Sequence, residues 1–234
     1  MCGQGLIIKG IQKLSLIDYP GKVACTLFTF GCNFRCPYCH NPELVTDDGT
    51  PPIPEEDVFR FLVERKGFLE GVCITGGEPT LHNDLPAFVK RIRNLGYSVK
   101  LDTNGTNPEM LSTLVREKLV DYIAMDVKAP LEKYESVVRV KVDLNKIAES
   151  VNMVKAFPEH EFRTTVVPEL LAKEDILAIA EWLKGAKRFF IQQFKPTKTL
   201  DKSFLEKQVY QAGELEKIRD EIKLLFEVCE IRNI

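Results

Sequence analysis

The chain has 234 residues, of which 44% are hydrophobic and 28% are charged, a composition typical of a globular protein with a sizeable core. Its 32 basic and 34 acidic residues give a net charge of −2, and no long run of like charge favours nucleic acid or an anionic membrane as a partner. No apolar run is long enough to span a membrane, and the first residues lack a signal-peptide pattern. We therefore expect a cytoplasmic protein.

Strand-like apolar runs alternate along the chain with amphipathic helical patterns, which is typical of a parallel sheet built from βα units. The predicted strands lie at 24–30, 71–75, 98–103, 122–127, 162–167 and 188–192. Pro54, followed by three acidic residues, predicts a helix start, and Gly96 predicts a helix end. Apolar stripes at helical spacing predict three further helices, with the residues Leu85, Phe88, Val89, Ile92 and Leu95; Leu144, Ile147, Ala148, Val151 and Val154; and Leu215, Ile218, Ile222, Leu225 and Phe226.

Six strand–helix units are fewer than the eight of a closed barrel, so we predict an α/β fold with an open, partial (β/α)6 barrel. No linker divides the sequence, which favours a single domain over 1–234. Its core would span about 20–195, and a C-terminal helical extension would span about 203–230 and include Cys229. In this architecture the functional side chains are expected at the C-terminal ends of the strands.

Three of the seven cysteines, Cys32, Cys36 and Cys39, form a CxxxCxxC motif after the first predicted strand. Three thiolates can hold three irons of a [4Fe–4S] cluster and leave the fourth iron open to another ligand. A zinc site or redox thiols are the alternatives, but tetrahedral zinc needs a fourth ligand, and His40 follows Cys39 too closely to serve well. The odd count and the clustering argue against a secreted disulfide framework.

The other four cysteines receive no role in the cluster. Cys25 and Cys73 lie in apolar strands and read as small core residues, and Cys2 lies near the start of the chain. Without a second cysteine motif, we expect a single cluster. His82 and His160 have no partner pattern and are expected to be solvated.

Further polar motifs follow the later strands, one per strand end. Gly76, Gly77 and Glu78 follow the second strand, Asp102 and Asn104 end the third, Asp126 and Lys128 end the fourth, and Arg163 lies early in the fifth. Each has an ordinary structural reading: GGEP as a turn, DTNG as a strand-to-turn signal, and the Asp–Lys pair as a weak surface ion pair. Their recurrence at one rim favours function, because buried charges are costly unless they are paired.

The combination of CxxxCxxC, GGEP, DTNG and DVK resembles the radical S-adenosylmethionine (SAM) superfamily over roughly residues 15–195. This resemblance implies that the three cysteines ligate a [4Fe–4S] cluster and that SAM chelates its open iron. Reductive cleavage of SAM would then give methionine and a 5′-deoxyadenosyl radical.

The resemblance also implies roles for the SAM-binding residues. Gly76, Gly77 and Glu78 would meet the SAM amino group with help from Asp102, and Lys128 would pair with the SAM carboxylate. The remaining implied contacts are Tyr38 against the adenine, Asp126 beside a possible monovalent cation, and Asn104 and Arg163 as further SAM contacts.

The stretch LSLIDYPGKVACTLFTFGCNFRCPYCHNPEL resembles glycyl-radical-enzyme activases, most of all those of anaerobic ribonucleoside-triphosphate reductase. The implied partners are that reductase and a small electron donor, either flavodoxin or ferredoxin. A pyruvate formate-lyase activase is an alternative, although IQQFKPT lacks the histidine that those enzymes carry after the sixth strand. A radical SAM enzyme for a small molecule, such as a deazapurine-forming synthase, and a non-enzymatic metal-binding scaffold are further alternatives.

Overall fold

The computed structural model describes residues 5–233, and Cys2 lies outside the described residues. The chain forms two compact units. Unit 1 comprises 1–33, 43–103 and 107–123, and unit 2 comprises 34–42, 104–106 and 124–234. The single domain expected over 1–234 stays a prediction.

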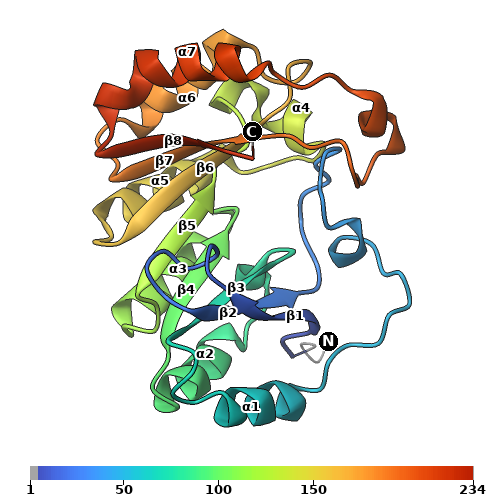
Figure 1. The fold of residues 1–234 in the computed structure, drawn as a ribbon, viewed down its shortest axis with the longest axis vertical. Coiled ribbons are helices and arrows are strands. Elements are labelled where there is room, and N and C mark those ends of the chain that lie inside the picture. Colours follow the sequence, from blue (N-terminus) through green and yellow to red (C-terminus); the bar gives the residue numbers. More distant parts are fainter. Residues whose placement is uncertain (1–4, 234) are drawn as a thin grey trace. The chain divides into compact units, whose positions relative to one another are not determined.

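Unit 1 is built on four neighbouring strands in chain order, with one antiparallel strand at the edge. Strand β1 runs antiparallel to β2, whereas β2, β3 and β4 are parallel. Helices α1 and α2 lie on one side of these strands (Figure 1). The elements of unit 1 are β1 (Ile8–Ser15), β2 (Ala24–Thr29), α1 (Glu55–Glu64), β3 (Gly71–Gly76), α2 (Leu85–Asn94), β4 (Ser98–Thr103) and α3 (Pro108–Arg116).

Unit 2 contains three parallel strands, β6, β7 and β8, in chain order. Helices α6 and α7 cover one face of β7 and β8 (Figure 1). Strand β5 (Tyr122–Asp126) leads the chain from unit 1 into unit 2. The elements of unit 2 are α4 (Tyr134–Val138), α5 (Leu144–Ala156), β6 (His160–Val166), α6 (Lys173–Leu183), β7 (Arg188–Gln193), α7 (Ala212–Ile222) and β8 (Val228–Arg232).

Local signals explain where the helices begin and end. Three acidic side chains occupy the first turn of α1, where they favour the positive end of the helix dipole. Asn107 caps α3 by accepting a hydrogen bond from the Met110 amide, and Asp143 caps α5 in the same way through Asn145. Gly96 follows α2 with φ +92°, a left-handed conformation that ends a helix at little cost when the residue is glycine.

Alternating strand residues form the core of each unit. In unit 1, Leu27, Ile74 and Leu101 are fully buried, and in unit 2 the same holds for Phe162 and Phe189. Each such side chain contributes roughly 1.5–3 kcal/mol when it leaves water. The strands are thereby fixed by their apolar residues, which leaves the strand ends available for polar side chains.

The predicted α/β fold with a mostly parallel, open sheet is confirmed, and within residues 5–233 the strands of neither unit close into a barrel. The bounds of β4 agree with the prediction. For the other five predicted strands, each end lies within two residues of its predicted position. Strands β1 and β8 were not predicted. The helix expected to include Cys229 is wrong there, because α7 ends at Ile222 and Cys229 lies in β8.

The two histidines expected to be solvated are not. His160 is buried, and its ring contacts the Phe157 carbonyl and accepts from the Lys187 amide. His82 is half-buried and its Nε2 lies 3.0 Å from the Phe30 carbonyl oxygen. Burial lowers the pKa of both rings. Both rings therefore have structural partners. His82 contacts the Phe30 carbonyl, and His160 contacts the Phe157 carbonyl and the Lys187 amide.

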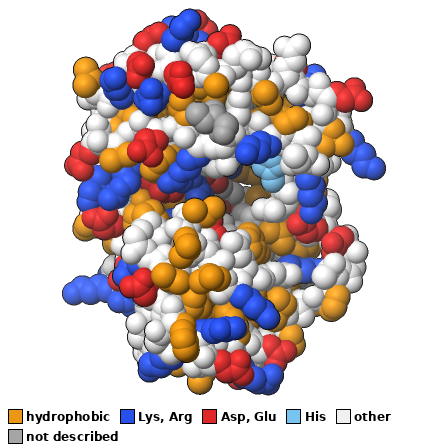
Figure 2. Space-filling view, in the orientation of Figure 1, with side chains coloured by type: hydrophobic (Ala, Val, Ile, Leu, Met, Phe, Trp, Pro, Cys, Tyr) orange, Lys and Arg blue, Asp and Glu red, His pale blue; other side chains and the backbone are white. Residues whose placement is uncertain are grey.

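Acidic and basic side chains are interspersed over the face drawn in Figure 2. This mixture agrees with the nearly equal totals of 34 acidic and 32 basic residues. No helix in the described part of the chain is long and apolar enough to cross a membrane.

Candidate functional site

The GGEP segment in unit 1 is joined closely to the backbone before Cys32. Gly77 donates its amide to the Thr29 carbonyl, and Glu78 donates to the Gly31 carbonyl at 2.7 Å. A Cβ at Gly77 would lie 1.9 Å from the Gly31 oxygen, so no larger residue fits. The glycine therefore lets β3 end directly against the segment that leads into the cysteine motif.

Glu78 is 1% exposed, and one of its oxygens, Oε1, accepts several hydrogen bonds. The donors are the Thr80 amide at 3.1 Å, the Thr80 hydroxyl, and the Thr103 hydroxyl at 2.7 Å. The side chain also caps the short helix Pro79–Leu81. GGEP thus forms a turn in which Glu78 holds Thr80. The contact between Glu78 and SAM stays a prediction.

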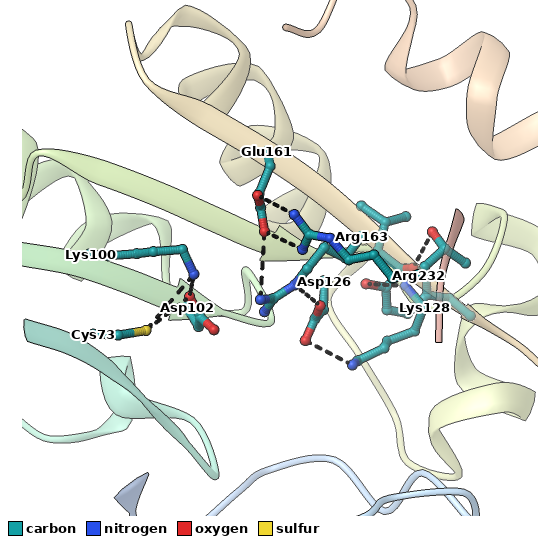
Figure 3. Close-up of polar contacts among 11 residues, drawn as sticks. Cys73, Lys100, Asp102, Asp126, Lys128, Glu161, Arg163 and Arg232 are labelled. Atoms are coloured by element: carbon teal, nitrogen blue, oxygen red, sulfur yellow. Dashed lines mark hydrogen bonds and ion pairs between the residues drawn. The ribbon is translucent and has the colours of Figure 1, made fainter. Parts of the chain in front are cut away.

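Asp102 lies in a buried charged cluster of unit 1 that was not predicted from the sequence (Figure 3). Lys100, on the same face of β4 and 1% exposed, forms an ion pair with Asp102 Oδ1. The Cys73 sulfur lies 3.7 Å from the same oxygen, and the Tyr122 ring lies 5.7 Å from the Lys100 ammonium. Cys73 is buried, as predicted, but it also contacts charge. The sequence did contain a sign of this pair, because a lysine lies two residues before an acid in an otherwise apolar strand.

Lys100→Met should lower the stability of the protein strongly, because it leaves the Asp102 carboxylate without its buried cation. The expected loss is about 3–5 kcal/mol in the free energy of unfolding, measured with urea on the protein without cofactors. The double variant Lys100→Met/Asp102→Asn should recover most of this loss. A single-variant loss below about 1 kcal/mol would show that the pair is well solvated.

Cys36, Tyr38 and Cys39 lie in one turn of unit 2. The Cys39 amide donates to the Cys36 carbonyl at 3.1 Å. Burial raises the pKa of the Cys36 thiol to about 11, against the opposing effect of Lys128. Iron binding at this thiol must therefore displace a proton. Thiols of this kind are suitable cluster ligands once they are deprotonated.

Tyr38 is 4% exposed, and its hydroxyl has no hydrogen-bond partner among the described residues. Burial, and next the Cys36 side chain, raise the pKa of this hydroxyl. A buried hydroxyl without a partner is uncommon, and a bound group or a water molecule is the usual reason for one. Its ring packs edge-on against Phe194, which also stacks on His40. Phe194 belongs to the IQQFKPT stretch that lacks the expected histidine.

Asp126, Lys128 and Arg163 form one ion-pair group in unit 2 (Figure 3). Lys128 contacts one oxygen of Asp126 at 3.2 Å, and Arg163 Nε donates to the other at 2.8 Å. Burial alone would raise the pKa of Asp126, but Arg163 and Lys128 hold that pKa well below its ordinary value. The three side chains are between 13% and 29% exposed, so the surface-pair reading does not apply.

Asn104 has a local structural role in unit 2. It is 5% exposed, and its Oδ1 accepts from the Thr106 amide at 3.0 Å and from the Thr106 hydroxyl at 2.7 Å. Gly105 between them has φ +77°. The strand-to-turn reading of DTNG is therefore correct, and the contact between Asn104 and SAM stays a prediction.

The predicted site residues thus fall into two groups that are described separately. Unit 1 contains Cys32, Gly76, Gly77, Glu78 and Asp102, and unit 2 contains Cys36, Tyr38, Cys39, Asn104, Asp126, Lys128 and Arg163. In unit 2, charge effects connect Cys36 with Lys128 and Asp126. Over residues 5–233, no three Cys, His, Asp or Glu side chains are placed to hold one metal ion. The cysteine ligand set therefore rests on residue type and stays a prediction.

Comparison with known proteins decides the family. Residues 26–183 match the model of the radical SAM superfamily. The chain belongs to the radical SAM superfamily. Members of this superfamily hold a [4Fe–4S] cluster and SAM, which are therefore the cofactors of this enzyme.

Relatives with names point to activases of glycyl radical enzymes. One, from Methanocaldococcus jannaschii, is named "Putative glycyl-radical enzyme activating enzyme MJ1227"; it is 36% identical over 97% of this chain and 96% of its own length. The pyruvate formate-lyase-activating enzyme of Clostridium pasteurianum is 26% identical over 86% of this chain and 85% of its own length. The chain is thus a radical SAM enzyme of the glycyl-radical-enzyme activating kind.

A solved structure supports the fold. Streptococcus suis SuiB bound to S-adenosylmethionine superposes with a TM-score of 0.64 and 14% identity, over 85% of this chain and 48% of SuiB. This chain spans about half of the SuiB chain, so the likeness concerns the shared fold alone.

Proposed function

We propose that this activase acts on an anaerobic ribonucleoside-triphosphate reductase, from which it removes a hydrogen atom at a backbone glycine. The observation that carries the proposal is the end-to-end match with a relative named as a glycyl-radical enzyme activating enzyme. The choice of the reductase rests on the DYPGK…CNFRCPYCHNPEL stretch, which resembles the activases of that enzyme.

When bound, the cluster and SAM supply one-electron cleavage of the sulfonium and so a carbon radical able to abstract hydrogen. The chain's own residues bind and orient. Cys32, Cys36 and Cys39 hold the cluster, and Lys128 pairs with the SAM carboxylate. In unit 2 the fit rests on the buried thiol of Cys36 and on the Tyr38 hydroxyl, which has no partner in the described protein.

Asp126 fixes Lys128 from one side, and Arg163 fixes Asp126 from the other. Both oxygens of Asp126 already contact a cation, so this geometry gives no support to the monovalent cation predicted beside it. In unit 1, the Glu78 carboxylate is proposed to accept from the SAM amino group, and Gly76 and Gly77 let the backbone of this segment lie directly against Thr29 and Gly31. These contacts are proposals.

The test is the reaction of the reconstituted, reduced protein with SAM and an anaerobic ribonucleotide reductase under strict exclusion of oxygen. An EPR signal of a glycyl radical, absent from a reductase whose radical glycine is replaced by alanine, is the expected result. The 5′-deoxyadenosine formed should match the radical in amount. Flavodoxin and ferredoxin should be compared as electron donors, because this donor is proposed as well.

Two further arms separate the alternatives. A radical that appears on pyruvate formate-lyase and not on the reductase would replace the partner but keep the activase. SAM cleavage that produces no protein radical, and that depends on an added purine precursor, would favour a small-molecule enzyme. A cluster indifferent to SAM would leave a metal-binding scaffold. A cytosolic location completes the proposal.

A further inference from the structure

A fourth and a fifth charge extend the Asp126 ion-pair group within unit 2. Glu161 on β6 is 1% exposed, and both of its oxygens accept from Arg232 on β8, at 3.0 and 3.1 Å. Figure 3 shows both arginines beside Glu161. Such a bidentate contact is the strong form of an ion pair, and it joins residues 71 positions apart.

The strand register explains how Arg232 reaches Glu161. Arg163 lies opposite Phe190 in the β6–β7 pair, and Arg232 lies opposite Gln192 in the β7–β8 pair. Because side chains alternate along a strand, these residues share one face of the sheet with Glu161. The Arg232 guanidinium crosses over the Phe190 ring at 3.3 Å. The ring and the two hydrogen bonds together hold the guanidinium in one orientation.

Arg163 lies between two carboxylates. Its Nε donates to Asp126 at 2.8 Å, and its Nη1 lies 3.7 Å from Glu161. The charges therefore alternate from Lys128 through Asp126, Arg163 and Glu161 to Arg232. Without Arg232, the buried Glu161 carboxylate would lose its bidentate partner, which favours a closer contact with Arg163, 3.7 Å away on its other side.

We propose that Arg232 is a positioning residue for SAM binding. It neutralises Glu161 and so leaves Arg163 bound to Asp126, which holds the Lys128 ammonium where it meets the SAM carboxylate. Loss of Arg232 turns Arg163 toward Glu161, and Asp126 then holds Lys128 alone and more tightly. This inference rests on the proposed function, since it requires Lys128 to bind SAM.

The test measures the dissociation constant of SAM for the reconstituted protein, from the change in the cluster EPR spectrum during a SAM titration. Arg232→Met should raise this constant at least about tenfold, the change that 1.4 kcal/mol produces. Turnover at saturating SAM should change less than the affinity. Arg219→Met is the matched control: Arg219 is 31% exposed, against 32% for Arg232, and pairs only locally with Asp220 among the contacts described for it.

A second-site variant separates charge from packing. Glu161→Gln/Arg232→Met removes both partners, so Arg163 has no reason to leave Asp126, and the SAM constant should return to within about threefold of the parent. Thermal unfolding of each variant without cofactors shows the temperature below which all are folded, and the titrations are done there.

Three outcomes would decide against parts of this scheme. An unchanged SAM constant in folded Arg232→Met overturns the inference, because Glu161 then simply takes up a proton. Failure of the double variant to recover affinity overturns it too, because Arg232 then acts through its packing on Phe190. If Lys128→Met leaves SAM affinity unchanged, the proposed SAM site itself is wrong.

Discussion

Cys36→Ala is expected to abolish SAM cleavage. Three thiolates are the minimum that holds a [4Fe–4S] cluster with one iron open, and with two the cluster is lost or indifferent to SAM. Cys36 lies in the turn shared with Cys39, whose amide donates to the Cys36 carbonyl. The measurement is iron and sulfide content after anaerobic reconstitution, followed by the amount of 5′-deoxyadenosine released on reduction.

Cys25→Ala is the matched control for this variant. Cys25 is also buried and its thiol pKa is also raised by burial, but it lies inside β2 among apolar residues. Its loss should cost only packing, about 1 kcal/mol in the free energy of unfolding, with cluster content unchanged. Cys229→Ala on β8 should behave in the same way. Near-normal SAM cleavage by Cys36→Ala would overturn the ligand assignment.

The strands that the sequence predicted well are those buried on both faces. Strand β4 agrees with its predicted bounds, and β2 and β3 differ from theirs by a single residue at one end. All three are short and contain β-branched residues such as Thr26, Ile74 and Val99, which favours a strand over a helix.

The two missed strands lack that signal. Strand β1 (IKGIQKLS) is an antiparallel edge strand with a glycine inside it and three exposed residues near its end. Strand β8 (VCEIR) follows a helical stripe, and its Cys229 continues the helical spacing from Phe226. A five-residue segment with only three apolar residues fits either the helical or the strand period, and only pairing with β7 decides between them.

The sequence indicates candidate site residues where a motif groups them, and it gives no sign of contacts that depend on a distant partner. CxxxCxxC, GGE and DVK each place several candidate site residues close together in the sequence. Glu161 and Arg232 are 71 positions apart, and nothing in the sequence around either indicates the other. The same holds for Lys100 and Phe194. Their contacts with Asp102 and Tyr38 are seen only in the folded structure.

Gly77→Ala is the second variant with a large expected effect. The added Cβ would lie 1.9 Å from the Gly31 oxygen and 2.5 Å from its carbon, and both are backbone atoms that no side-chain rotation can move. The ends of β2 and β3 would have to separate, which breaks the bond from the Glu78 amide to Gly31 and shifts the backbone next to Cys32. We expect cluster content to fall strongly and stability to fall by about 1–3 kcal/mol.

Gly213→Ala tests whether this effect is local. Gly213 lies in α7, and a methyl group added there would meet no atom within 4 Å outside its own helix. Alanine should therefore keep the cluster and gain up to about 1 kcal/mol from its better helix propensity. Iron content and urea unfolding measure both variants. If Gly77→Ala reconstitutes as fully as Gly213→Ala, the segment before Cys32 can yield without disturbing the cysteines. The close approach of the two backbones would then serve the fold of unit 1 and not its chemistry.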